Sequence, residues 1–177
     1  MSREVDFIKD VDDGQELWKL AVRVEDLWKS GVGKNEHIEF LILDKQGDNI
    51  QVLLPADLCP TWGPKLSEGS TYIMKNFKVQ NNEFGVKFCD HPFMLVMVGG
   101  EGGSKVVPTK LPDIPKYALK FKPFPDITSG KYKSDLLVDV IGAVYDVAAE
   151  KKSFGSKKFP TTVSLADAEM NIVTATP

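Results

Sequence analysis

The sequence is poor in the residues that build catalytic and metal sites, with two cysteines and two histidines among 177 residues. His37 and His91 are isolated from any nucleophile or acid that could complete a catalytic group. Cys59 and Cys89 lack the spacing of zinc ligands, so we expect free thiols in an intracellular protein, with a disulfide between them as the alternative. We therefore expect no enzyme activity, no metal and no cofactor.

The chain also lacks an apolar run long enough to span a bilayer, and its N-terminus is polar and acidic, unlike a signal peptide. An excess of positive charge is missing too. Residues 1–100 carry 11 Lys and Arg against 16 Asp and Glu, and residues 101–177 carry 11 against 9. Binding to nucleic acid therefore requires a local groove or stacking rings, because the overall charge would not drive it.

An internal repeat is the main positive feature. Residues 41–55 align without a gap with residues 163–177, and each segment is typical of a strand, a polar turn and a second strand. The first copy continues for about forty more residues, whereas the second ends with the chain. The repeat predicts two copies of one small β domain, the second of them incomplete.

Hydrophobic periodicity predicts the strands of each copy. The side chains of Trp18, Leu20, Val22 and Val24 alternate with mostly polar ones and are expected to face inward. In the first copy the strands are expected at residues 18–25, 38–43, 50–54, 71–79 and 93–98, with a short or broken helix within 56–69. In the second copy they are expected at residues 135–146, 161–165 and 172–176.

The predicted order of elements in the first copy is a three-stranded meander, a helix and a two-stranded hairpin. This is the order found in the five-stranded Greek-key barrel called the OB-fold. We therefore predict an all-β protein with an OB-fold domain at residues 17–99 and an incomplete second one, a three-stranded meander, at 134–177. Residues 1–16 are predicted to be an N-terminal extension with a turn or short helix against the barrel. Residues 100–133, rich in Gly, Pro and Lys, are predicted to be a linker.

Several segments resemble the DNA-binding domains of the large subunit of plant replication protein A. In the first domain these are the opening strand from Trp18 to Trp28, the hairpin 38–54 and the segment 68–79, and residues 121–142 resemble the join into the second domain. The resemblance implies single-stranded DNA, or RNA, as the partner in replication, repair or recombination. It also implies a nuclear location and replication protein A-like partner subunits. Because no apolar run is long enough to span a bilayer, we expect no membrane partner.

An OB barrel binds single strands in a trough over its second and third strands, by stacking bases on rings and pairing phosphates with cations. Phe84 is the first candidate ring, because it stands at a hairpin tip and matches a stacking aromatic of the family; packing on its own hairpin is the alternative. Trp28 is the second candidate, with a barrel-capping role as the alternative. Phe77 and Phe88 are more simply core residues.

Seven cationic or polar side chains complete the predicted interface. Arg23 and Lys75 are the better candidates, because each faces away from the inward apolar set of its strand. The other candidates are Lys29, Lys34, Gln51, Lys78 and Lys87. A basic loop at residues 151–158 could also contact phosphates or act as a nuclear-import signal, although a solvated loop is the simpler interpretation.

Two residues and the acidic charge of the first domain favour a different function. Glu39 shares the predicted binding face and opposes the cations, and Gln51 and Pro55 stand where family members carry a basic residue and an aromatic. The alternative is an OB-fold module that has lost DNA binding and binds protein, with a partner or a second copy of the chain completing the second domain. DNA binding requires a trough that is neither filled by the protein's own side chains nor lined with carboxylates.

Overall fold

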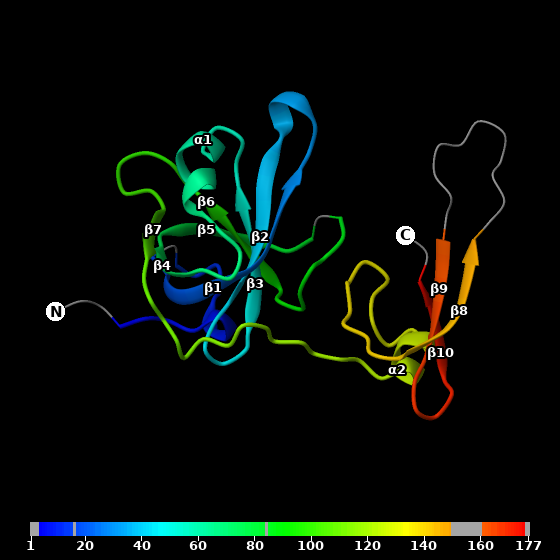
Figure 1. The fold of residues 1–177 in the computed structure, drawn as a ribbon. Helices are drawn as coiled ribbons and strands as arrows, with labels where there is room; N and C mark the ends of the chain where they lie inside the picture. Colours follow the sequence, from blue (N-terminus) through cyan, green and yellow to red (C-terminus); the bar gives the residue numbers. More distant parts are fainter. Residues whose placement is uncertain (1–3, 16, 84, 150–160, 176–177) are drawn as a thin grey trace. The chain divides into compact units, whose positions relative to one another are not determined.

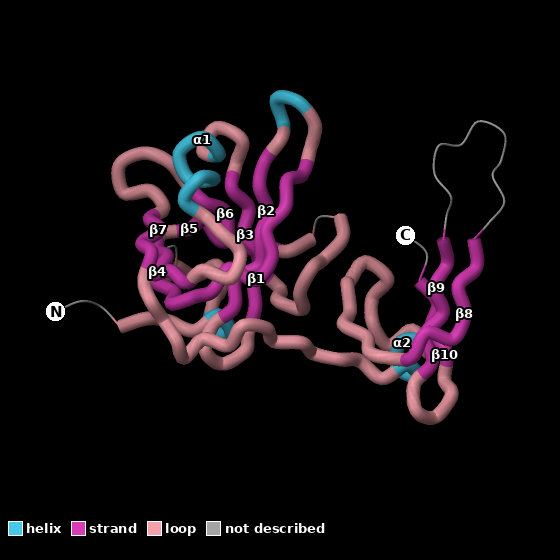
Figure 2. The backbone as a smooth tube through the Cα atoms, viewed as in Figure 1, coloured by secondary structure: helices cyan, strands magenta, loops and turns pink. Residues whose placement is uncertain are grey.

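The computed structural model describes residues 4–15, 17–83, 85–149 and 161–175. The chain divides into two compact units, Met1–Ala118 and Leu119–Pro177, and each is described by itself. Strands dominate both units, and helical segments are few and short (Figures 1 and 2).

The first unit is a curled sheet whose strand order is β5-β6-β3-β2-β1-β4-β7. Only Asn76 separates β4 from β5, so these are two halves of one bent strand that pairs first with β1 and then with β6. This bend closes the barrel, and the predicted OB-fold with one short helix is confirmed. The elements are η1 (Ile8–Asp10), β1 (Lys19–Ser30), η2 (Gly33–Asn35), β2 (His37–Leu43), β3 (Asn49–Leu54), α1 (Cys59–Trp62), η3 (Gly63–Lys65), β4 (Thr71–Lys75), β5 (Phe77–Asn81), β6 (Phe93–Met97) and β7 (Lys105–Pro108).

The barrel core follows the predicted alternation along β1. Trp18, Leu20, Val22 and Val24 are all at most 5% exposed, and they pack with fully buried residues of β2 and β3. Phe77 also belongs to this core, as predicted. Both cysteines are free thiols, and Cys89 is buried.

The second unit is a three-stranded sheet in the order β10-β9-β8, preceded by a short helix. Its elements are α2 (Phe124–Thr128), β8 (Ala143–Ala149), β9 (Thr161–Ala166) and β10 (Ile172–Ala175). The predicted three-stranded meander is confirmed, although its first strand begins later than the expected residues 135–146. Residues 133–136 form a turn instead, closed by a hydrogen bond from the Leu136 N–H to the Lys133 carbonyl.

The two units repeat one another in detail. In β1 the register with β2 shifts between Val24 and Asp26, and in β8 the register with β9 shifts in the same way between Val144 and Asp146. The β2–β3 turn is closed by Asp44, whose Oδ1 accepts the N–H groups of Gln46 and Asp48. In the β9–β10 turn Asp167 does the same for Glu169 and Asn171.

These turns correct the register of the repeat. Asp44 corresponds in space to Asp167, whereas the gap-free sequence alignment pairs Asp44 with Ala166. The shift of one residue places each aspartate where its side chain can cap the turn. The identical Asn-Ile and Pro residues in the gap-free alignment are therefore a chance coincidence.

Each copy also begins with the same short segment, which we call the hook and which includes residues 6–8 in the first unit and 122–124 in the second. The Asp6 N–H donates to the Lys19 carbonyl, and the Lys122 N–H donates to the Asp139 carbonyl. Two residues later a helical turn begins at a buried side chain, which is Ile8 in the first unit and Phe124 in the second. The hook covers the part of β1 that extends beyond its pairing with β2, where backbone groups would otherwise lack partners.

The expectation of a linker at residues 100–133 is therefore wrong for much of that segment. Residues 105–108 form β7 on the edge of β4, and residues 119–133 form the hook and α2 of the second unit. Proline and lysine content suggested an extended chain, but pairing to a sheet edge also requires an extended chain.

We predict that Met170→Gly stabilises the second unit by about 1 kcal/mol, because Met170 adopts a left-handed φ of 64° that costs a non-glycine residue about 1–2 kcal/mol. Gly47 occupies the equivalent place in the first unit with φ of 83°. The side chain of Met170 is 63% exposed, so little packing is lost. Slower amide hydrogen exchange in β9 and β10 would show the effect, and Met170→Ala, which keeps the strain, serves as the control. Equal exchange rates in the two variants would contradict the prediction.

Candidate nucleic-acid interface

One row of outward-facing side chains crosses the barrel from β5 to β1. Cross-strand pairing places Lys78 beside Val96, Val96 beside Leu53, Leu53 beside Glu39 and Glu39 beside Trp28. Lys78 is exposed, and the other four are half-buried. The next row inward contains Leu95, Val52 and Phe40, all fully buried, which confirms that the first row faces outward.

Trp28 ends this row in contact with Phe88 from the β5–β6 loop. The two ring centroids lie 4.4 Å apart with an interplanar angle of 41°. Phe88 is half-buried and lies outside the core cluster, so its expected place in the core is wrong. The sequence carries no periodic signal for this pair, because Phe88 lies in an irregular loop.

A hydrogen-bonded network of three side chains lies beside Trp28. Gln51 Nε2 donates to Glu39 Oε2 over 2.6 Å, and His37 Nε2 lies 3.0 Å from Glu39 Oε1. His37 Nδ1 lies 2.9 Å from the Asn35 carbonyl oxygen. Because both ring nitrogens face acceptors, a doubly protonated imidazole satisfies both, and its charge neutralises Glu39.

The pKa of His37 is raised above its ordinary value of 6.5. The hydrogen bond to the Asn35 carbonyl is the main cause, burial opposes it, and the Glu39 carboxylate raises the pKa further. Above the raised pKa the carboxylate loses its counter-charge, and the trough becomes less favourable for phosphate.

The rest of the trough is covered, contrary to the requirement for an open surface. Leu41, Gln51 and Met94 form the next outward row and are 4–7% exposed, and Leu43 beyond them is fully buried. The Oε1 atom of Gln51 is buried without a partner among the described residues. Gln51 therefore does not line an open groove, although it holds Glu39 in place.

A segment that we call the strap, residues 109–118, crosses the outer side of β1. Arg23 donates from Nε to the Pro115 carbonyl over 2.9 Å, from Nη2 to the Ile114 carbonyl over 2.8 Å, and from Nη1 to the Gly69 carbonyl. The Ala118 N–H donates to Glu25 Oε1. The guanidinium thus fastens the strap, and we leave Arg23 out of the proposed interface.

The predicted lysines separate into two groups. Lys78 lies on the open row, and Lys29, Lys34 and Lys87 lie in or next to the loops at its ends. Lys29 pairs with Glu36 over 2.9 Å, which raises the pKa of Lys29. Lys75 is not near this row: it lies on β4, opposite Lys19 of β1 and Lys105 of β7.

Two predicted elements lie outside the described residues, namely Phe84 and the basic loop at 151–158. Among the residues that the structure does describe, no group of three or more His, Cys, Asp or Glu side chains could hold a metal ion. No helix in the described part of the chain is both long enough and apolar enough to cross a membrane.

The folded protein binds the His37 proton more tightly than the unfolded chain does, because the pKa of His37 is raised in the folded state. We therefore expect the stability that His37 contributes to be fully present below about pH 6.5, the ordinary pKa of histidine. This stability should be lost as the pH rises through the raised folded-state pKa. Urea unfolding across this range measures the loss, and His37→Gln should abolish it. An NMR titration of the ring should show a lower His37 pKa in Glu39→Gln. An unchanged His37 pKa in that variant would refute the network.

The fold is similar to that of a solved replication protein A. A replication protein A heterotrimer bound to single-stranded DNA is 18% identical, with a TM-score of 0.54, and the match covers 98% of this chain and 41% of that one. Fission yeast Pot1 with single-stranded DNA is 12% identical with a TM-score of 0.42, covering 62% of this chain and 41% of that one. The chain thus spans about two-fifths of each. At the level of the fold, the predicted resemblance to replication protein A is confirmed.

No curated protein matches the sequence. The model of a family described as a domain of unknown function, DUF223, matches residues 9–130, which include the whole barrel, the strap and the hook of the second unit. Because this match covers well over half of the chain, the protein belongs to the DUF223 family.

Proposed function

We propose that the first unit binds single-stranded DNA at the open end of its trough. The observation that carries the proposal is the outward row from Lys78 to Trp28, which offers a cation at one end, half-exposed apolar side chains in the middle and the Trp28–Phe88 rings at the other. Bases can lie against the apolar part and the rings while phosphates follow the lysines.

Stacking supplies most of the affinity in this proposal. The first unit is acidic overall, and Glu39 lies in the row itself, so phosphate contacts are few. A stacked base contributes about 1–3 kcal/mol, which can exceed the repulsion from one carboxylate that His37 neutralises. Phe84, beside the Phe88 loop in sequence, stays in the proposed site as a further ring.

The finer assignment follows from the resemblance to replication protein A. We propose a passive role in the nucleus, in which the protein shelters unpaired DNA during replication, repair or recombination without a cofactor or chemistry. Replication protein A-like subunits are the proposed partners. A barrel that shields bases by stacking has no need of sequence readout, so little sequence preference is expected.

Lys78→Gln is expected to weaken binding of a labelled single-stranded oligonucleotide severalfold and to reduce the slope of log K against log salt by about 0.7, the value for one phosphate contact. Lys75→Gln is the matched control, because Lys75 lies off the row on β4 and should change neither quantity. Fluorescence anisotropy at several salt concentrations, with a duplex in parallel, measures both. Equal effects of the two substitutions would reject the row as the binding surface.

The same anisotropy titration tests the proposed stacking role of the Phe84 ring. Phe84→Ala should weaken binding by about 1 kcal/mol or more with little change in melting temperature, because a stacked base is lost. Phe121→Ala, which removes a 46% exposed ring from the second unit, is the control. An unaltered binding curve for Phe84→Ala would remove Phe84 from the site.

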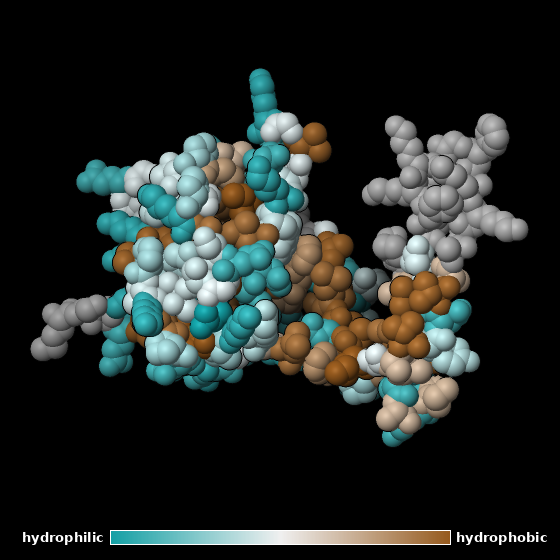
Figure 3. Space-filling view, in the orientation of Figure 1, coloured by the Kyte–Doolittle hydropathy of each residue, from teal (hydrophilic) through white to brown (hydrophobic). Residues whose placement is uncertain are grey.

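A second candidate function is protein binding through the second unit, with a partner or a second copy of the chain. Val144 and Val147 of β8 are 66% and 55% exposed, and Val163, Leu165 and Val173 lie on the same face of the sheet. Apolar colour gathers over β8 and β9 in Figure 3. The corresponding face of the first unit is its buried core, whereas no strand among the described residues of the second unit covers this face.

If this second function holds, light scattering should show association of the chain with itself, and Val144→Ser with Val147→Ser should reduce it. A monomer that binds oligonucleotide at all accessible concentrations would contradict self-association.

A further inference from the structure

A cavity of about 320 Å³ lies on the outer side of β1, at the half of the strand that pairs with β4. Ala21 lines its wall on β1, between the N-terminal hook and the strap. The apolar lining residues are Val5, Phe7, Ala21, Leu111, Pro112 and Ile114. Ala21 pairs with β4, whereas Trp28 pairs only with β2, so this cavity is separate from the open row.

The walls of the cavity are fastened to the barrel by hydrogen bonds. On the hook side, the Asp6 N–H donates to the Lys19 carbonyl and the Ile8 N–H donates to Asp44 Oδ2. On the strap side, the Leu111 N–H donates to Thr71 Oγ1, and Arg23 holds the Ile114 carbonyl. A cavity framed in this way exists before a ligand arrives, as small-molecule sites usually do.

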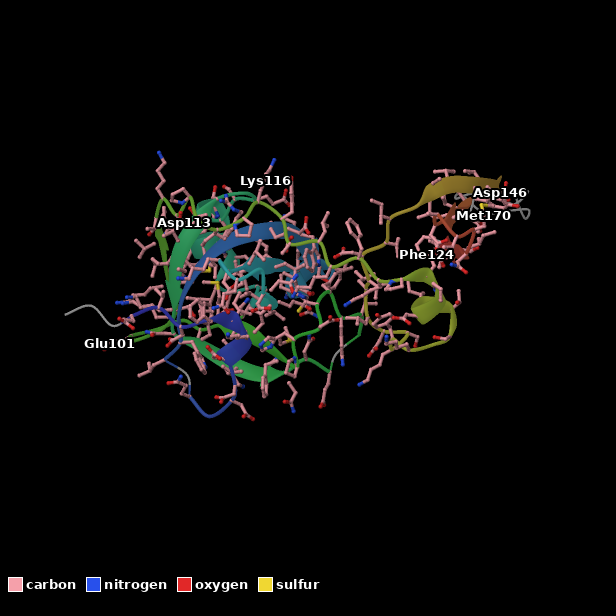
Figure 4. All side chains as sticks on the ribbon, turned by 90° about the horizontal axis from the view of Figure 1, so that it is seen from below. Glu101, Asp113, Lys116, Phe124, Asp146 and Met170 are labelled. Carbon is pink, nitrogen blue, oxygen red and sulfur yellow. The ribbon has the colours of Figure 1, made fainter. Side chains whose placement is uncertain are left out.

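Charged side chains surround the apolar lining, and their exposure and hydrogen bonds indicate which of them a ligand can reach. Lys45 and Lys110 are exposed, and the Lys45 ammonium lies 5.2 Å from the centre of the Phe7 ring. Asp44 is 2% exposed and accepts three backbone N–H groups, so it offers no open acceptor to a ligand. Asp113 lies exposed on the strap, and Figure 4 shows it on the surface of the first unit.

We propose that this cavity binds a nucleoside monophosphate. The base lies against Phe7 and the apolar wall, the phosphate pairs with Lys45 and Lys110, and Asp113 accepts a hydrogen bond from an exocyclic amino group. The small volume suits one nucleotide and not a longer chain. A ring, two cations and three carboxylates line the cavity, and two of these carboxylates, Asp6 and Asp44, already accept backbone N–H groups. The ring, the two cations and Asp113 favour this ligand over a purely apolar peptide side chain, which would leave the cations without partners.

The test is an NMR and calorimetric titration of the full chain with deoxyadenosine monophosphate. Inorganic phosphate, deoxyadenosine and N-acetylphenylalanine amide are separate arms. We expect the monophosphate to bind at least about tenfold more tightly than each of these, because only it uses both the ring and the cations. Equal binding of inorganic phosphate, tighter binding of the phenylalanine amide, or no binding of the monophosphate would overturn the proposal.

Two variants locate the site. Ala21→Leu fills the cavity and should weaken binding of the monophosphate at least about tenfold, and Lys110→Gln, which is at the surface and should not affect folding, should weaken it severalfold. Ala143→Leu, the same change on an exposed strand of the second unit, is the control and should have no effect. Oligonucleotide binding should be unchanged in Ala21→Leu, so failure here is distinguishable from failure of the proposed trough. Undiminished monophosphate binding in both cavity variants would refute the site.

Discussion

The closure of the barrel at Asn76 is the constraint on which the rest of the first unit depends. With φ of 62°, this one residue turns the chain so that β4 pairs with β1 and β5 pairs with β6. Its side chain donates to the Gly102 carbonyl, and its own carbonyl accepts the hydroxyl of Ser104. The bend therefore fixes the start of β7 as well as the outward row, because Lys78 reaches that row only through the β5–β6 pairing.

The two units share backbone features but differ in the side chains at equivalent positions. Hook, bulge and aspartate-capped turn occur in both units. The hook and the capped turn each satisfy backbone groups that such a meander would otherwise expose. The side chains around them differ. Ala148 of β8 stands at the position of Trp28, and Met170 replaces Gly47. Among the described residues, therefore, only the first unit has the Trp28 ring, the turn with glycine at its left-handed position and the closed core.

Burial and charge together restrict where a nucleic acid can bind. The rows of Leu41 and Leu43 are covered, and Arg23, one of the two better cationic candidates, donates its hydrogen bonds to carbonyl groups of Gly69 and the strap. Among the described residues of the predicted trough, the row that ends at the Trp28–Phe88 pair stays accessible. Glu39 would disfavour phosphate there, but it is held between His37 and Gln51, which makes its effect dependent on pH.

The sequence by itself determined the OB-fold, the inward face of β1 and the existence of a repeat, because alternation and turn residues act over a few neighbouring positions. It could not determine the register of the repeat, the partners of Arg23 or the separation of Lys75 from Lys78. Arg23 meets the strap 91 and 92 residues away, and the bend at Asn76 sends two nearby lysines to different surfaces. Contacts between distant segments and the closure of the barrel decided these features, and neither leaves a local pattern in the chain.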